Sequence, residues 1–218
     1  MIHTQSMKTF WASWLLWIFA NTIGAAIGLA ITLVAIDVIG FDSDSTISLV
    51  YVIGFNYDST TISPVLVVAT TICIGASQWF IVRKYATRAV LWIVASVFGV
   101  FLGAIAIGLV AWIANITIGV DRMSKVMQGA FSMAVPLTLY GASVGFTQWL
   151  FLRKHTIHAN TNWWILASAI GAALLGIFIG NWMGNIAELI FILVGTIPAI
   201  ITGFVWAMLL QQPLRSAQ

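Results

Sequence analysis

The sequence predicts an all-α integral membrane protein with six transmembrane helices, arranged as three two-helix repeats around a pseudo-threefold axis, with both termini cytoplasmic. Composition gives the class, because 61% of the 218 residues are hydrophobic and only 7% are charged, too little polar surface for a soluble globule. Six apolar runs give the number of helices, since a spanning helix needs about 20 apolar residues. A motif that occurs three times gives the repeats.

Each apolar run predicts one helix. The runs cover residues 10–35, 63–82, 89–114, 130–152, 163–180 and 187–210. The first is longer than the apolar core of a secretory signal and carries the repeated motif, so we expect it to stay in the mature protein. Residues 1–218 are expected to form a single transmembrane domain.

Two motifs define the repeats. The sequence Trp-Ile-x-Ala-(Asn/Ser)-x-(Ile/Phe)-Gly begins at Trp17, Trp92 and Trp164. The sequence Gly-x-(Ser/Thr)-Gln-Trp-x-x-(Val/Leu)-Arg-Lys occupies 75–84 and 145–154. The repeat units are therefore about 9–85, 86–155 and 156–215, and units of two helices enter the membrane in the same orientation.

The third unit departs from the pattern in its second helix. It keeps Gly203, and the spacing from that glycine puts Trp206 where the other units have Gln78 and Gln148. The same spacing puts Gln211 where the other units have the arginine of the motif. A ring of three amides is therefore not expected.

The basic residues predict the orientation. Seven fall on one side of the predicted membrane: Lys8, Arg83, Lys84, Arg88, Arg153, Lys154 and Arg215. Only Arg122 and Lys125 fall on the other side. Short loops rich in Lys and Arg stay in the cytoplasm, so both termini are expected there. The same asymmetry favours contact with the lipid bilayer, through anionic lipid of the inner leaflet, over binding of nucleic acid.

Most of the 11 tryptophans lie toward the predicted cytoplasmic ends of the helices. These are Trp11, Trp14, Trp17, Trp79, Trp92, Trp149, Trp163, Trp164 and Trp206. Amphipathic indoles favour the membrane surface, so we interpret them as interface anchors. An aromatic cage for a cation or a pigment is the alternative.

Small residues recur every four positions on the first helix of each unit. The stripes are Ala20-Gly24-Gly28, Ala95-Gly99-Gly103 and Ala172-Gly176-Gly180. Such stripes let helix backbones approach closely in lipid, where hydrophobicity does not drive association. The six glycines Gly24, Gly28, Gly99, Gly103, Gly176 and Gly180 are therefore the predicted helix-packing positions.

Five uncharged polar residues are the candidate binding residues. They are Asn21, Gln78, Ser96, Gln148 and Ser168. Their depth in the helices lets Asn21 reach Gln78 and Ser96 reach Gln148. In one interpretation they form interhelical hydrogen bonds worth roughly 0.6 to 2 kcal/mol each. In the other, they line a solute site near the pseudo-axis.

Patterns of catalysis are missing from the sequence. We find no His, Cys and acid cluster at metal-ligand spacing, no nucleophile elbow and no phosphate loop, so no enzyme, metal or cofactor is expected. Cys73 has no partner for an intrachain disulfide. The longest loop, 36–62, is expected to be a solvated acidic loop with two short strands or interfacial segments.

The chain resembles a group of bacterial multi-pass proteins, common in cyanobacteria, that carry Gly-x-x-Gln-Trp-x-x-Leu-Arg segments followed by Trp-Ile-x-Ala-Ser-x-x-Gly. The part from Gly145 to Arg153, with Trp163 to Ser168, is the most similar. The group is uncharacterised, so the resemblance implies no activity. It implies a bacterial plasma membrane or thylakoid location.

Three functions agree with these features. The first is a non-enzymatic assembly or accessory component that packs through its small-residue faces, alone as a homo-oligomer or with other membrane proteins. The second is a small-solute permease or channel with a site formed by the five polar residues. The third, motivated by the richness in tryptophan, is a pigment- or quinone-binding protein.

Overall fold

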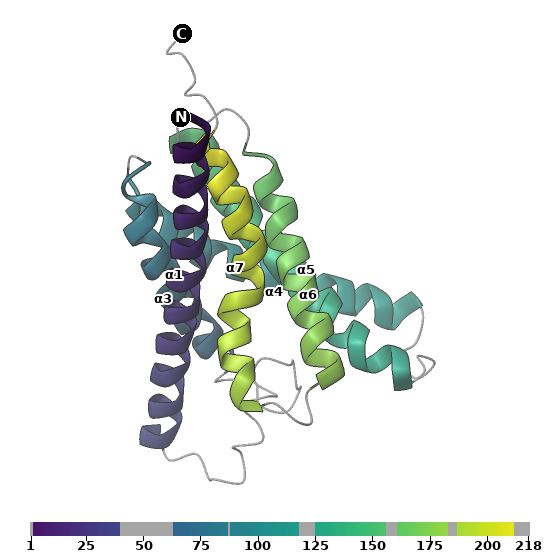
Figure 1. Ribbon diagram of the computed structural model, residues 1–218. Coiled ribbons are helices and arrows are strands. Elements are labelled where there is room, and N and C mark those ends of the chain that lie inside the picture. Colours follow the sequence, from purple (N-terminus) through teal and green to yellow (C-terminus); the bar gives the residue numbers. More distant parts are fainter. Residues whose placement is uncertain are drawn as a thin grey trace.

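The computed structural model describes residues 2–39, 63–86, 88–117, 125–155, 161–182 and 187–211, and six helices make up nearly all of this part (Figure 1). They are α1 (Ile2–Ile39), α3 (Ser63–Val82), α4 (Val90–Thr117), α5 (Lys125–His155), α6 (Trp163–Trp182) and α7 (Ala187–Gln211). The all-helical prediction is confirmed. Residues 36–39, assigned to the outer loop, are instead helical because the apolar run continues to Ile39. The rest of that loop lies outside the described residues.

The prolines fit the helices in two ways. Pro64 is the second residue of α3, in the first turn, where a missing N–H costs nothing. Pro136 and Pro198 lie inside α5 and α7, where each removes one backbone hydrogen bond. Thr202, one turn after Pro198, donates its Oγ1 hydroxyl to the carbonyl of Pro198 itself at 2.9 Å.

The six helices pack in a closed ring. Each helix packs against the next one along the chain, and α7 packs against α1. Consecutive helices run in opposite directions, so the first turns of α4 and α6 lie beside the last turns of α3, α5 and α7 at one end of the ring (Figure 1). We call this the tryptophan end, after Trp17, Trp92, Trp164 and Trp206.

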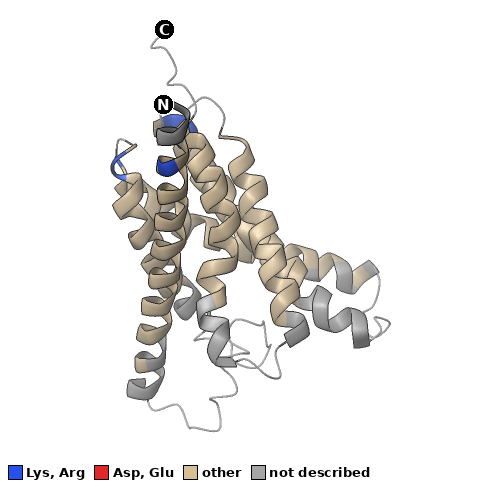
Figure 2. Ribbon diagram, in the orientation of Figure 1, with Lys and Arg blue, Asp and Glu red and all other residues tan. Residues whose placement is uncertain are grey.

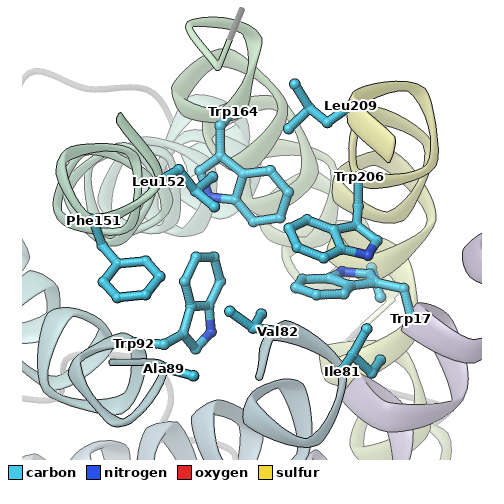
Figure 3. Packing of buried hydrophobic residues seen from close by; sticks show 11 residues of the cluster. Trp17, Ile81, Val82, Ala89, Trp92, Phe151, Leu152, Trp164, Trp206 and Leu209 are labelled. Carbon is cyan, nitrogen blue, oxygen red and sulfur yellow. The ribbon is translucent and has the colours of Figure 1, made fainter. Parts of the chain in front are cut away.

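These four tryptophans fill the inside of the ring (Figure 3). Trp17, Trp92 and Trp164 are 0% exposed, and Trp206 is 1% exposed. The rings of Trp17 and Trp206 stack with centroids 5.0 Å apart, and Trp164 meets Trp92 edge-on at 5.6 Å. The prediction that these four are interface anchors is wrong, because each indole points into the ring and fills space between helices.

The outside of the ring is apolar. Phe19, Ile105, Trp112 and Ile116 are all at least 60% exposed. By length and composition, three helical segments are able to cross a membrane: Met7–Ile31, Val90–Val110 and Leu193–Gln211. Two shorter helical segments are also apolar, Val68–Val82 and Trp163–Ile179. These features favour a membrane location.

Glycines bring the two helices of each unit together. A Cβ added to Gly24, Gly99 or Gly171 would lie 2.5–2.8 Å from a backbone Cα of α3, α5 or α7, respectively. Gly171 is thus the counterpart of the first two, although the stripe predicted for α6 does not include it.

The other predicted packing glycines divide between two interfaces. Gly28 and Gly103 lie against α3 and α5, in the same interfaces as Gly24 and Gly99. Gly176 lies against Ala134 of α5, so it packs toward the preceding unit. The surroundings of Gly180 lie outside the described part of the chain.

Candidate functional site

The five candidate polar residues lie inside the ring at the tryptophan end. Asn21, Gln78, Ser96, Gln148 and Ser168 are all buried, with exposed fractions of 2–8%. A buried amide or hydroxyl without a partner costs about 1–3 kcal/mol. Their hydrogen bonds therefore decide whether the arrangement is structural or leaves groups free for a ligand.

Gln78 of α3 joins three helices. Its Nε2 donates to Asn21 Oδ1 of α1 at 2.7 Å. Its Oε1 accepts from Trp92 Nε1 of α4 at 2.8 Å. The predicted contact between Asn21 and Gln78 is therefore confirmed, and Trp92 is an additional partner.

Gln148 of α5 makes the same pair of contacts one unit later. Its Nε2 donates to Ser96 Oγ of α4 at 2.9 Å, and its Oε1 accepts from Trp164 Nε1 of α6 at 3.0 Å. The predicted contact between Ser96 and Gln148 is confirmed. Gln148 Nε2 also lies 3.5 Å from Gln78 Oε1, so the two amides meet inside the ring.

The first repeated motif orients the polar residue of each unit in the same way. Asn21, Ser96 and Ser168 each donate to the backbone carbonyl of the motif tryptophan four residues earlier, at 2.8–2.9 Å. This bond turns the polar side chain along the helix. The tryptophan and the polar residue of each motif then lie one turn apart on the helix face that points into the ring. The indole N–H is available as a donor, and the oxygen of the polar side chain is available as an acceptor.

In the third unit, Thr202 of α7 takes the place of the glutamine. Trp17 Nε1 donates to Thr202 Oγ1 at 3.1 Å, as Trp92 and Trp164 donate to their glutamines. Trp206, which the sequence spacing put at this position, lies one helical turn further on. The prediction from spacing is wrong by four residues.

Backbone contacts establish the same shift independently. Gly141, seven residues before Gln148, lies against the carbonyl of Ser168 and the Cβ of Ala172. Gly195, seven residues before Thr202, lies against the carbonyl of Asn21 and the Cβ of Ala25. Asn21 and Ser168 occupy the same motif position, and each alanine follows four residues later. These contacts align Thr202 with Gln148.

With this alignment, Trp206 corresponds to Val82 and Leu152, which belong to the same buried cluster (Figure 3). Its indole replaces an aliphatic side chain rather than an amide. Trp206 Nε1 is buried and has no hydrogen-bond partner within the described part of the chain. The position thus contributes apolar volume and not a polar contact.

One link is missing at the third position. Ser168 Oγ donates to Trp164 O, and Thr202 Oγ1 donates to Pro198 O. Neither side chain bonds to the other, because threonine is shorter than glutamine. The hydrogen bonds of the candidate polar residues and Thr202 therefore join α7 to α1, α1 to α3, α3 to α4, α4 to α5 and α5 to α6. Among these described side chains, none joins α6 to α7.

A second polar contact crosses the ring further from the tryptophan end. Thr71 Oγ1 of α3 and Tyr140 Oη of α5 lie 2.7 Å apart. We did not predict this pair, nor the role of the three motif tryptophans as donors. A tryptophan four residues before Asn21, Ser96 and Ser168 was the available signal for those donors.

The chemistry of the site is that of neutral hydrogen-bonding groups. Amides, hydroxyls and indoles form the network, and none of them ionises near neutral pH. Among the described residues, no three His, Cys, Asp or Glu side chains gather as a metal site would require. The arrangement suits helix association or recognition of a neutral group, and not acid–base catalysis.

No protein-family model, curated protein or solved structure matches the chain. The resemblance drawn from its motifs therefore stays a prediction.

Proposed function

We propose that this chain is a non-enzymatic, six-span protein of a bacterial plasma membrane or thylakoid that serves as an assembly or accessory component. Its three two-helix units would surround a pseudo-threefold axis, with both termini in the cytoplasm. The observation that carries the proposal is that four of the five candidate polar side chains bond across helix interfaces to one another or to the motif tryptophans.

Several features support the six-span arrangement. Helices α3 and α6 have 20 residues each, which corresponds to about 30 Å of rise, the thickness of a bilayer core. The Lys and Arg residues with described placement, coloured blue on the ribbon in Figure 2, lie at the tryptophan end. Equivalent motif residues make equivalent contacts at three places around the ring.

The hydrogen bonds favour a structural role over a solute site. Both polar ends of Gln78 and of Gln148 already have partners at 2.7–3.0 Å. A solute that took either amide would leave a tryptophan N–H or a neighbouring side chain unpaired, at a cost of about 1–3 kcal/mol. The four packed indoles also occupy the centre of the ring at this level, where a solute or pigment would have to pass or bind.

Replacement of Gln78 or Gln148 by leucine tests the proposal. A structural role predicts a loss of about 0.5–2 kcal/mol in unfolding free energy for each variant, because two partners lose their bonds. Abundance and recovery of co-purifying membrane proteins should fall together with stability. Unfolding in detergent, abundance in the membrane and co-purification are the measurements.

Thr147→Val is the matched control. Thr147 is buried beside Gln148, but its hydroxyl bonds only to carbonyls of its own helix, Ser143 O and Val144 O. The control should retain the abundance and stability of the natural protein. A Gln78→Leu/Gln148→Leu double variant that melts, accumulates and co-purifies normally but loses uptake of a solute would establish the permease function instead.

A further inference from the structure

The second repeated motif forms two exposed arginine–tryptophan pairs at the tryptophan end. The Arg83 guanidinium carbon lies 5.0 Å from the ring centroid of Trp79 and 4.9 Å from that of Phe80. The Arg153 guanidinium carbon lies 5.5 Å from the ring centroid of Trp149. The four-residue spacing in the motif thus places each guanidinium beside an indole.

A guanidinium held beside an aromatic ring by a cation–π contact keeps N–H donors for another partner. The N–H donors lie in the guanidinium plane, where they match the spacing of two phosphate oxygens. Arg83 and Arg153 are both exposed, and neither guanidinium makes a hydrogen bond to another described residue. Within the described part of the chain, each guanidinium therefore has N–H donors available for a further partner.

The local charge favours an anion. Lys84 and Lys154 directly follow the two arginines, so each helix end carries two full positive charges. The dipole of a helix end opposes an anion with only about half a charge. Asp37 and Glu188 lie near the other ends of α1 and α7, so they do not neutralise this end.

The surroundings select an amphipathic anion. Phe80 is 55% exposed on the outside of α3, and Leu150 is 46% exposed on the outside of α5. Charged donors and bare apolar surface thus meet at the same height on each helix. A free phosphate would use only the donors, whereas a phospholipid would use the apolar surface as well.

We propose that Arg83 with Trp79, and Arg153 with Trp149, each bind the phosphodiester of one anionic phospholipid. The guanidinium edge takes two phosphate oxygens, and the acyl chains lie along α3 or α5. The described part of α7 has no such pair, because Gly203 and Ala207 align with the tryptophan and the arginine. The inference rests on the membrane insertion proposed above.

Binding of lipid to detergent-purified protein tests this inference. Native mass spectrometry with phosphatidylglycerol should detect two tight lipids per chain, against few with phosphatidylcholine. Arg83→Gln and Arg153→Gln should each weaken one site about tenfold, the effect of losing a charge-assisted hydrogen bond. Arg83→Lys should also weaken its site, because lysine keeps the charge but not the planar donor edge.

Lys8→Gln is the control, since Lys8 is exposed at the same end and, among the described residues, makes no cation–π contact. It should leave both sites unchanged. Equal weakening by Lys8→Gln would show a diffuse electrostatic attraction and overturn the two sites, as would unchanged binding in the Arg83→Gln/Arg153→Gln variant. Inorganic phosphate that displaces the lipid at equal concentration would assign the sites to free phosphate.

The arginine variants leave the interior hydrogen bonds intact, so they should melt normally in the absence of added lipid. Loss of lipid binding in such a variant concerns these two sites alone. If the proposed membrane location is wrong, a different result is expected: the chain would appear in the soluble fraction of cells lysed without detergent.

Discussion

Trp17 and Thr202 lie 185 residues apart in the chain, and a hydrogen bond of 3.1 Å from Trp17 Nε1 to Thr202 Oγ1 joins them. This bond connects α1 to α7 where glutamines connect the other units. A threonine is long enough to accept from the tryptophan but too short to reach Ser168. Thr202 therefore makes one of the two contacts, to a tryptophan and to a polar residue, that Gln78 and Gln148 each make.

Thr202→Gln should complete the missing contact. The amide oxygen would accept from Trp17, and the amide nitrogen would donate to Ser168, as Gln148 does between Trp164 and Ser96. We expect the free energy of unfolding to rise by about 0.5–1.5 kcal/mol, the net value of one hydrogen bond. Chemical or thermal unfolding in detergent measures it, and the gain should vanish in a Ser168→Ala background.

Thr202→Val has the opposite expected effect. Valine keeps the shape of threonine but gives Trp17 Nε1 no acceptor, so stability should fall by about 1–3 kcal/mol. The same unfolding measurement applies. If glutamine and valine at this position destabilise the protein equally, Thr202 is not the counterpart of Gln148.

Replacement of the two stacked tryptophans by leucine should give unequal losses. Trp206→Leu introduces the kind of side chain found at Leu152, and Trp206 Nε1 has no hydrogen-bond partner to lose among the described residues. Trp17→Leu removes a similar ring and also its hydrogen bond to Thr202. Both open a cavity, and we expect Trp17→Leu to cost about 1 kcal/mol more. Equal losses would mean that packing alone determines both.

Leucine in place of a packing glycine should damage the fold much more than leucine at Gly108. A Cβ on Gly99 or Gly176 would fall 2.5–2.6 Å from a backbone Cα of α5, whereas a Cβ on Gly108 meets nothing within 4 Å. Gly99→Leu and Gly176→Leu should therefore lower the melting temperature or prevent accumulation. Melting curves for the three variants that coincide would place both glycines on lipid-facing surfaces.

Reporter fusions test the predicted topology. Fusions after Arg88 and after Lys154, and at the C-terminus, should be active only with a cytoplasmic reporter, because basic residues flank these points. A fusion between Asp42 and Asp58 should report the outside. An outside signal at Lys154 would rule out the six-span arrangement.

The helices and two interior contacts were predictable from the sequence, for physical reasons. Uninterrupted apolar runs determine where helices lie in a membrane protein. The motifs placed Asn21 and Gln78 at the same depth on consecutive helices, so their contact followed. The repeated positions of Ser96 and Gln148 gave the second contact in the same way.

The sequence does not predict whether a given tryptophan points into the ring or away from it. These helices are apolar on all sides, so periodicity does not distinguish an inner from an outer face. Trp163 and Trp164 illustrate this, because the first is 60% exposed and the second is 0% exposed. The position of Thr202 was hidden for another reason. Gly203 and Trp206 mimic the spacing of Gly75 and Gln78, and only packing against α1 reveals the shift.

The ring closes between helices that are far apart in the order of translation. Until the ribosome has made α7, Trp17 lacks its acceptor and the centre of the bundle lacks the indole of Trp206. Without α7 the ring is open between α6 and α1, and α7 supplies both the hydrogen-bond acceptor of Trp17 and the apolar volume of Trp206. An α7 donated by a second nascent copy would fit the same gap, which makes domain swapping the characteristic assembly error of this architecture.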